Sequence, residues 1–262
     1  MKVGIAWRDA WRTDLFAYQG AIECLELTCE HVLDGTAEQR ELIDLLARHW
    51  QVLPHGLDLS LGSADGIDQR HLERVAAVVA RCKAPWWSEH LAFTRAGGRR
   101  LGHLAPLPPT REAVAVVARN VATVRRTLGT PLLLENIACP VELPGEFDEP
   151  GFLRAVADAT GCSLLLDVSN AWIGCVNRGE SFDRWLDRFP LDRVVQLHVA
   201  GFRRVGGLLI DTHADPLADE AIGAVRAVLA RCAPQAIILE RDDRLPPWAE
   251  MRGELEALRG AR

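Results

Sequence analysis

The chain has 262 residues, of which 48% are hydrophobic and 25% are charged, a composition typical of a globular protein with a sizeable core. Its formal net charge of −6 argues against general binding to the nucleic acid backbone. The cysteines are scattered without a C-x-x-C pair, the first residues read as a strand rather than a signal peptide, and no apolar run has the length of a membrane span. We therefore expect a soluble cytoplasmic protein with reduced thiols that binds neither nucleic acid nor membrane.

Short aliphatic runs alternate with segments of helical periodicity along the chain. Strands are predicted, in chain order, at 3–7, 21–27, 51–55, 85–91, 131–136, 163–168, 193–199 and 236–241. Helices are predicted at 37–50, 71–82, 111–128, 148–160, 218–232 and 247–258. Thr36 and Thr110 are the predicted N-caps of two of these helices, and the segment 9–20 offers only a short helix.

Eight strands that alternate with helices over about 250 residues predict a single (β/α)8 TIM barrel spanning 1–262, with both faces of each strand covered. A doubly wound open sheet is the alternative, and it normally has a glycine-rich phosphate-binding turn after the first strand. The stretch AWRDAW at that place is not such a turn. No change of composition marks a second domain, and 135–151 reads as a long loop.

The predicted strand ends carry residue types that bind metals, at the edge of a barrel where active sites form. These residues are His55, His90, Glu135, Asp167 with Asn170 three residues later, His198, Asp211 and His213 in the following loop, and Glu240. Taken singly, each would more often be a hydrogen-bonded or ion-paired strand-end residue. Several acids that converge on one mouth repel each other unless a cation lies among them. The joint pattern therefore predicts a multinuclear site for metals such as zinc, manganese or iron.

Other charged residues are predicted to lie outside this site. His31, in a loop, and His49 and His71, on helices, read as solvated, and His103 reads as a loop residue with the rim of the mouth as the alternative. Five arginines fall in the loops after the fourth and seventh strands: Arg95, Arg99, Arg100, Arg203 and Arg204. They read as solvated charges, with a rim that attracts an acidic peptide or a carboxylate as the alternative.

The predicted ligand arrangement resembles the trinuclear site of endonuclease-IV-type barrels and their xylose-isomerase-like relatives. The surrounding sequence resembles another group more closely, the multinuclear non-heme iron-dependent oxidative enzymes of methanobactin and thia-amino-acid biosynthesis. The matching stretches are PHGLDLSLGS, SEHLAF, LENI, GCSLLLDVSNAW, LHVAGF, LLIDTHADP and LERDDRLP. The matches run from about Gly4 to Leu258, nearly the whole chain.

This resemblance implies an oxidase that uses two or three irons, in mixed ferrous and ferric states, and dioxygen to modify cysteine residues of a ribosomally made precursor peptide. It also implies a small partner protein that presents the peptide. Carried onto this chain, one iron would be held by His55, His90 and Glu135. Glu135 would bridge to a second iron held by Asp167, His198 and Glu240. A third site would use Asn170, Asp211 and His213, with Asp167 as a possible bridge.

Two other functions are compatible with the same scaffold. One is a zinc- or manganese-dependent hydrolase or sugar isomerase, and the other is a non-catalytic peptide-binding relative. Asn170 favours the iron enzymes, because the endonuclease-type pattern is expected to carry histidine there. An amide oxygen is a weaker ligand than imidazole, so the third site is expected to be the loosest.

Parts of the chain depart from the family pattern. Arg8 matches a family arginine, but the rest of the first loop, RDAWRTDLF, lacks the expected histidine and tyrosine. The loop ACPVELPG after the fifth strand lacks the expected aromatic residue. Both loops are predicted to line the substrate mouth, so the peptide and its product stay open. Glu26 matches a family glutamate and is expected either to support a metal ligand or to pair with an arginine.

Overall fold

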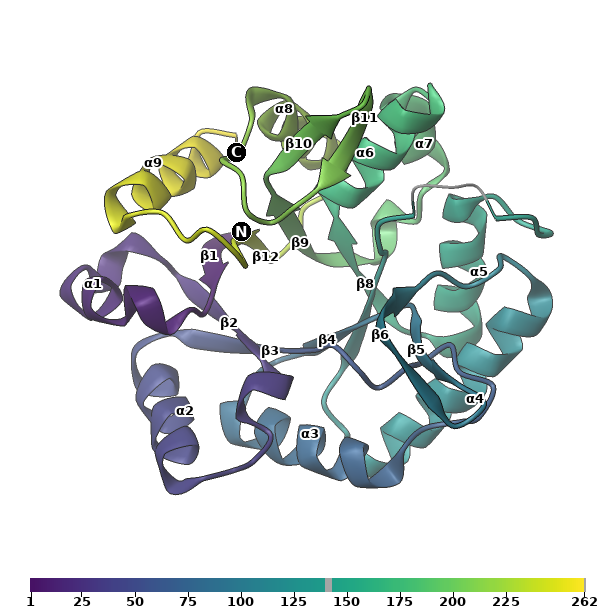
Figure 1. Cartoon of the computed structure of the whole chain (residues 1–262), viewed down its shortest axis with the longest axis horizontal. Coiled ribbons are helices and arrows are strands. Elements are labelled where there is room, and N and C mark those ends of the chain that lie inside the picture. Colours follow the sequence, from purple (N-terminus) through teal and green to yellow (C-terminus); the bar gives the residue numbers. More distant parts are fainter. Residues whose placement is uncertain (140–142, 262) are drawn as a thin grey trace.

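The computed structural model describes residues 1–139 and 143–261 of the chain. Eight parallel strands close into a barrel in the order β1-β12-β9-β8-β7-β4-β3-β2 (Figure 1). They are β1 (Lys2–Ala6), β2 (Cys24–Thr28), β3 (Gln51–Gly56), β4 (Trp87–His90), β7 (Leu132–Glu135), β8 (Ser163–Asp167), β9 (Val194–Ala200) and β12 (Ala236–Glu240). The predicted single (β/α)8 barrel is confirmed, and an open doubly wound sheet is excluded by the pairing of β1 with both β2 and β12.

Helices surround the barrel in Figure 1. They are α1 (Arg12–Ala17), α2 (Ala37–His49), α3 (Gln69–Cys82), α4 (Arg111–Thr127), α5 (Glu149–Thr160), α6 (Val168–Arg178), α7 (Phe182–Arg188), α8 (Asp219–Leu229) and α9 (Trp248–Arg259). Thr36 forms a capping box with Gln39, and Thr110 accepts a hydrogen bond from the backbone of Ala113, as predicted. No helix in the described part of the chain has the length and apolar character needed to span a membrane.

The strand residues divide between two faces, and this division positions the site. Side chains two residues apart on a strand point the same way. Leu133, Leu165 and Ile238 are fully or almost fully buried in a small apolar cluster separate from the main core. Each lies two residues before a predicted ligand on β7, β8 or β12. The barrel interior is therefore apolar below and rich in metal-binding groups at its carboxyl end.

Two β-hairpins stand where the sequence predicted loops. The first joins β5 (Phe93–Ala96) to β6 (Arg99–Ala105), and the second joins β10 (Phe202–Val205) to β11 (Leu208–Asp211). Each turns at a Gly-Gly pair whose residues all have positive φ, at 97–98 and 206–207. The tight turns that match the twist of paired strands require positive φ at both central residues, which glycine adopts readily. The Gly-Gly pairs were therefore the signal in the sequence for both hairpins.

Helices α6 and α7 were also missing from the sequence prediction. Helix α6 begins directly after β8, without a loop, and Asp167 accepts a hydrogen bond from the backbone N–H of Asn170 as its N-cap. The second predicted strand is also shorter than expected, because 19–21 forms a 3₁₀ turn instead. The predicted loop after β7 is confirmed where the structure describes it, and 140–142 lie outside the described residues.

Candidate metal centre

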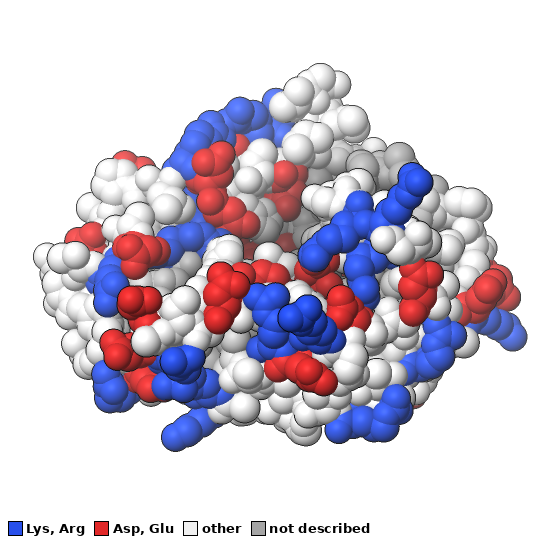
Figure 2. All heavy atoms as spheres, turned by 60° about the horizontal axis from the view of Figure 1, so that its bottom comes forward, with Lys and Arg blue, Asp and Glu red and all other residues white. Residues whose placement is uncertain are grey.

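The structure brings the predicted ligands together at the carboxyl end of the barrel. All of them except His198 line one cavity of about 490 Å³. His198 is fully buried beside it and contacts Glu135 and Glu240. Figure 2 shows acidic side chains around a hollow in this face, with basic side chains on the surface nearby. Residues from six barrel strands, the first turn of α6 and the end of the β10–β11 hairpin thus share one mouth.

A first group consists of His55, His90 and Glu135, which each offer a ligand atom within 4.8 Å of the others. Oε2 of Glu135 lies 3.6 Å from Nε2 of His55 and 3.5 Å from Nε2 of His90. This oxygen is buried and has no hydrogen-bond partner. Nδ1 of His55 lies 2.8 Å from the hydroxyl of Ser88, so Nε2 is the nitrogen turned to Glu135. A buried carboxylate oxygen without a partner is costly, and a metal ion shared with the two imidazoles would satisfy it.

The two histidines of this group have opposite pKa shifts. Burial, with His90 and His198 nearby, holds the pKa of His55 well below its usual value. Burial also opposes protonation of His90, but Glu135 and Glu89 outweigh it and raise the pKa of His90 to about 9. In the absence of metal, His55 is therefore neutral at pH 7 while His90 carries a proton.

A second group consists of Glu26, His198 and Glu240. Nδ1 of His198 lies 3.0 Å from Oε1 of Glu135 and 3.2 Å from Oε2 of Glu240, while Nε2 lies 2.7 Å from Oε2 of Glu26. Burial opposes protonation, but Glu240, Glu26 and Glu135 raise the pKa of His198 well above its usual value. Glu26 also accepts a hydrogen bond from Gln196. The alternative of an arginine partner for Glu26 is therefore wrong.

A third group consists of Asp167, His213 and Glu240. Asp211 ends β11, and its Oδ2 lies 2.8 Å from Nε2 of His213, whose φ of 48° is left-handed. The pair thus meets through a bend rather than through regular strand spacing. Asn170 donates from Nδ2 to Asp167 at 2.9 Å, and its Oδ1 is buried without a partner. Burial, together with Asp211 and Glu240, raises the pKa of Asp167 to about 8, which reflects the crowding of carboxylates.

This geometry groups two residues differently from the arrangement that the resemblance implied. Asp167 lies with His213 rather than with His198, and Glu26 takes the place beside His198. The donor set fits metal ions, because imidazole nitrogens and carboxylate oxygens converge while buried oxygens of Glu135, Asn170 and Asp211 lack partners.

Asp242 also lines the cavity, although it was not among the predicted ligands. Its Oδ2 lies 3.2 Å from Nδ1 of His213, and its other oxygen pairs with Arg8. Burial opposes its ionisation, but His213 and Arg8 outweigh it and lower the pKa of Asp242 to about 2. The available signal was its position two residues after Glu240, the same spacing that links Asp211 to His213. Asp242 thereby contacts Nδ1 of His213 and leaves Nε2 turned to Asp211.

The remaining histidines differ from expectation in two cases. His31 lies in a 3₁₀ turn and lines the cavity, so the expectation that it lies outside the site is wrong. His71 is partly buried, with Nε2 3.2 Å from Glu30, rather than solvated. His49 is exposed as predicted, and His103 is exposed on β6 without lining the cavity.

The five arginines that were expected to be solvated loop charges lie on the two hairpins. Arg100 pairs with Asp58, and Arg203 pairs with Asp215 at 2.9 Å. Arg95 bonds to the carbonyl of Gly66. Arg99, Arg100, Arg203 and Arg204 are nevertheless exposed, as expected of solvated charges, Arg95 is partly buried, and none of the five lines the cavity.

Comparisons with known proteins identify the family of this chain. The family model described as RiPP precursor modification enzyme MbnB/TglH/ChrH matches residues 2–262, where RiPP denotes a ribosomally synthesised, post-translationally modified peptide. A protein named UPF0276 from Caulobacter vibrioides is 35% identical over 250 residues, 95% of this chain and 89% of its own length. Another from Rhizorhabdus wittichii is 36% identical, covering 91% of this chain and 86% of its own length.

Solved structures share the fold at low sequence identity. A xylose isomerase domain protein from Planctomyces limnophilus has a TM-score of 0.64 at 11% identity and covers 99% of this chain and 96% of its own. Endonuclease IV from Thermus thermophilus has a TM-score of 0.55 at 16% identity and covers 100% and 98%. At such identities the likeness shows the barrel architecture and no activity.

Proposed function

The chain belongs to the MbnB/TglH/ChrH family of RiPP precursor modification enzymes, and from this premise we propose that it is an iron- and dioxygen-dependent oxidase of cysteine residues in a precursor peptide. The observation that carries the proposal is the buried carboxylate of Glu135. One of its oxygens faces His55 and His90, and the other lies 3.0 Å from His198. A carboxylate between two groups of histidines could contribute a ligand atom to each of two metal ions.

We assign three metal positions to these residues. The first would be held by His55, His90 and Glu135, and the second by Glu135, His198 and Glu240, with Glu26 behind His198. The third would use Asp167, Asn170, Asp211 and His213, with Glu240 within reach of both neighbouring groups. Asp167 is then a ligand of the third position or a bridge between the second and third.

Iron, when bound, supplies open coordination positions and redox capacity for the oxidation of a cysteine thiolate by dioxygen. Neighbouring side chains orient the candidate histidine ligands for this role. The hydroxyl of Ser88 lies 2.8 Å from Nδ1 of His55, and with Nδ1 protonated Nε2 would be the nitrogen that binds a metal. Glu26 holds the proton on Nε2 of His198, so that Nδ1 is the nitrogen left to bind metal. The apolar residues below the mouth exclude water from beneath the site.

Charged residues around the mouth support the proposal that the substrate is a peptide. Both hairpins contribute to the cavity lining, through Leu104 and Asp211, and both carry exposed arginines. We propose that these arginines attract acidic residues of the precursor peptide. A small partner protein that presents the peptide stays a prediction from the family resemblance.

Metal analysis under anaerobic conditions tests the proposal. Protein purified without oxygen is expected to hold at least two irons per chain. It should consume dioxygen with a cysteine-containing peptide encoded in a neighbouring reading frame, but not with the same peptide carrying serine in place of cysteine. Glu135→Ala is expected to lose both iron and activity. A stoichiometric zinc content without iron-dependent oxygen uptake would contradict the proposal and favour the zinc- or manganese-dependent hydrolase or isomerase.

A further inference from the structure

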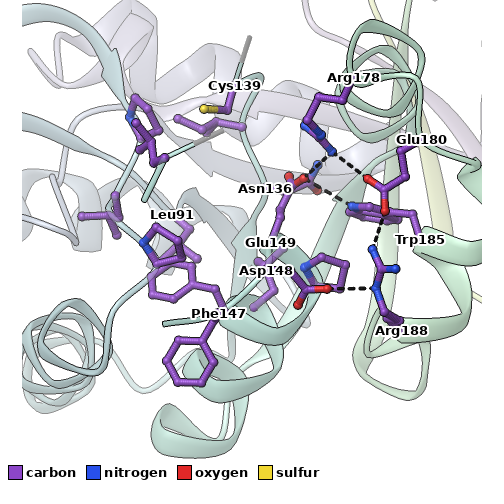
Figure 3. A pocket seen from close by; sticks show the side chains of 18 residues that line it. Leu91, Asn136, Cys139, Phe147, Asp148, Glu149, Arg178, Glu180, Trp185 and Arg188 are labelled. Atoms are coloured by element: carbon purple, nitrogen blue, oxygen red, sulfur yellow. Dashed lines mark hydrogen bonds and ion pairs between the residues drawn. The ribbon is translucent and has the colours of Figure 1, made fainter. Parts of the chain in front are cut away.

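A second cavity, of about 360 Å³, lies beside the metal cavity, and Figure 3 shows the side chains that line it. It is formed by the end of β4, the segments that precede α4 and α5, and helices α5 to α7. Ile137 lines both cavities. The two spaces are therefore neighbours that share a side chain.

The strand ends explain how the chain divides its side chains between the two cavities. Successive strand residues point to opposite sides. His90 and Glu135 line the metal cavity, and the next residues, Leu91 and Asn136, line the second cavity. Asn136 is held by two hydrogen bonds to the backbone of Asp167, of 3.0 and 2.9 Å. The shared wall is thus tied to the same strand that carries a candidate ligand.

One side of the second cavity is charged but internally paired. Arg178 lies 3.2 Å from Glu149 and 3.4 Å from Glu180, and Arg188 pairs with Glu180 and, at 2.9 Å, with Asp148. Figure 3 shows this network on one side of the cavity and Leu91 on the other. Because each of these carboxylates already has an arginine partner, the wall offers no free counter-charge to a charged ligand.

The other side of the cavity is apolar. Leu91 lies on it, the cavity lining also includes the nearly buried Leu107, Phe152 and Leu153, and Trp185 lies on the charged side. Nε1 of Trp185 donates to Glu149, so its polar atom is already used. An apolar cavity with paired polar groups favours an apolar occupant, since a polar one would lose its hydrogen bonds to water without replacement.

We propose that this second cavity binds an aliphatic or aromatic side chain of the precursor peptide, located within two positions of the reacting cysteine. The inference rests on the proposed function, because it places the cysteine in the adjoining metal cavity. An extended peptide advances about 3.3 Å per residue. With the cysteine in the metal cavity, a residue one or two positions away is therefore the one whose side chain enters the second cavity on the other side of Ile137. The cavity volume accommodates one such side chain with room for its backbone.

Peptide binding to the metal-free protein tests this subsite without any chemistry. The probes are hexapeptides with serine in place of the cysteine, in which one residue within two positions of the serine is Leu, Phe, Ala or Asp. Calorimetric titration is expected to show that the best Leu or Phe peptide binds at least tenfold more tightly than the matching Ala and Asp peptides, since a buried large apolar side chain contributes more than a methyl group. Equal affinities at every position would overturn the proposal.

Substitutions at Leu107 locate the binding to this cavity. Leu107→Phe narrows the cavity and is expected to remove the tenfold preference for Phe, whereas Leu107→Ala widens it and should strengthen that preference. The same two substitutions at the exposed Leu208 are the matched controls and should change nothing. Opposite shifts at Leu107 support the subsite, and identical preferences in all four variants would contradict it. Either Leu107 variant suffices if the other does not fold.

Different experimental results would contradict the subsite and the proposed function. An apolar preference without iron or oxygen uptake would retain the peptide subsite and refute the oxidase. Iron-dependent oxidation of a cysteine peptide with no preference for an apolar neighbour would retain the oxidase and refute the subsite.

Discussion

Oε2 of Glu26 lies 2.7 Å from Nε2 of His198, and both side chains are almost completely shielded from solvent. The contact holds the imidazole so that Nδ1 points to Glu135 and Glu240. Carboxylate–histidine pairs of this kind orient metal-binding imidazoles and increase their basicity. Glu26 is thus a positioning residue in the proposed site rather than a ligand.

Glu26→Gln tests that role. The substitution keeps the shape but removes the charge, so we expect an affinity for the second metal that is about 10–100-fold lower. The number of metals bound at saturation should stay unchanged, as measured by anaerobic titration with ferrous iron. A loss of one metal per chain even at saturating iron would instead show that Glu26 is itself a ligand. Glu254→Gln, in an ion pair with Arg241 outside the cavity, is the control.

The third metal should leave the protein first. Asn170 contributes a neutral amide oxygen, and its Nδ2 is already bonded to Asp167. Stepwise dialysis against a chelator is therefore expected to remove one metal per chain before the others. Asn170→Ala should remove the same metal and leave the rest bound, as counted by metal analysis. Simultaneous loss of all metals in this variant would contradict separate positions.

Metal binding should weaken as the pH falls. Carboxylates overcome the effect of burial and raise the pKa of His90 to about 9 and the pKa of His198 well above its usual value. Both imidazoles therefore carry protons at pH 7 in the metal-free protein, and metal must displace them. Each displaced proton lowers the apparent affinity about tenfold per pH unit below the pKa of its group. Competition titrations between pH 6 and 9 measure this slope, and a flat profile would refute the assignment of these ligands.

Gly201 links the barrel to the hairpin that carries Asp211. A Cβ at this position would lie 1.8 Å from the carbonyl oxygen of Asp215. Gly201→Ala must therefore displace the segment around His213, and we expect a loss of about 2–3 kcal/mol of stability together with weaker retention of the third metal. Gly223→Ala is the matched control, because nothing lies within 4 Å of its Cβ and alanine favours its helix by about 0.5–1 kcal/mol. Thermal unfolding and metal analysis of both variants check the prediction.

The barrel could be predicted because its eight strands are short and apolar and alternate with amphipathic helices. The hairpins could not be predicted by the same signal, since β6 and β10 are largely exposed and carry arginines; only the Gly-Gly turns marked the hairpins. Helix α6 was missed because it begins without a loop and is buried on most sides, so it lacks the polar face that reveals a helix. Asp242 was missed because its role depends on a histidine 29 residues away in the chain.

The sequence by itself determined that the predicted ligands lie at one mouth, although not that His31 and Asp242 join them, because parallel strands bring their carboxyl ends to one edge and side-chain direction alternates along each strand. Only the tertiary structure decided which of these residues lie close enough together to bind the same metal ion. The two oxygens of Glu135 face different histidines, Asp167 lies with His213, and Glu26 lies behind His198. Such groupings depend on distances of a few ångströms across the barrel, which strand register and packing set and which no local pattern of residues records.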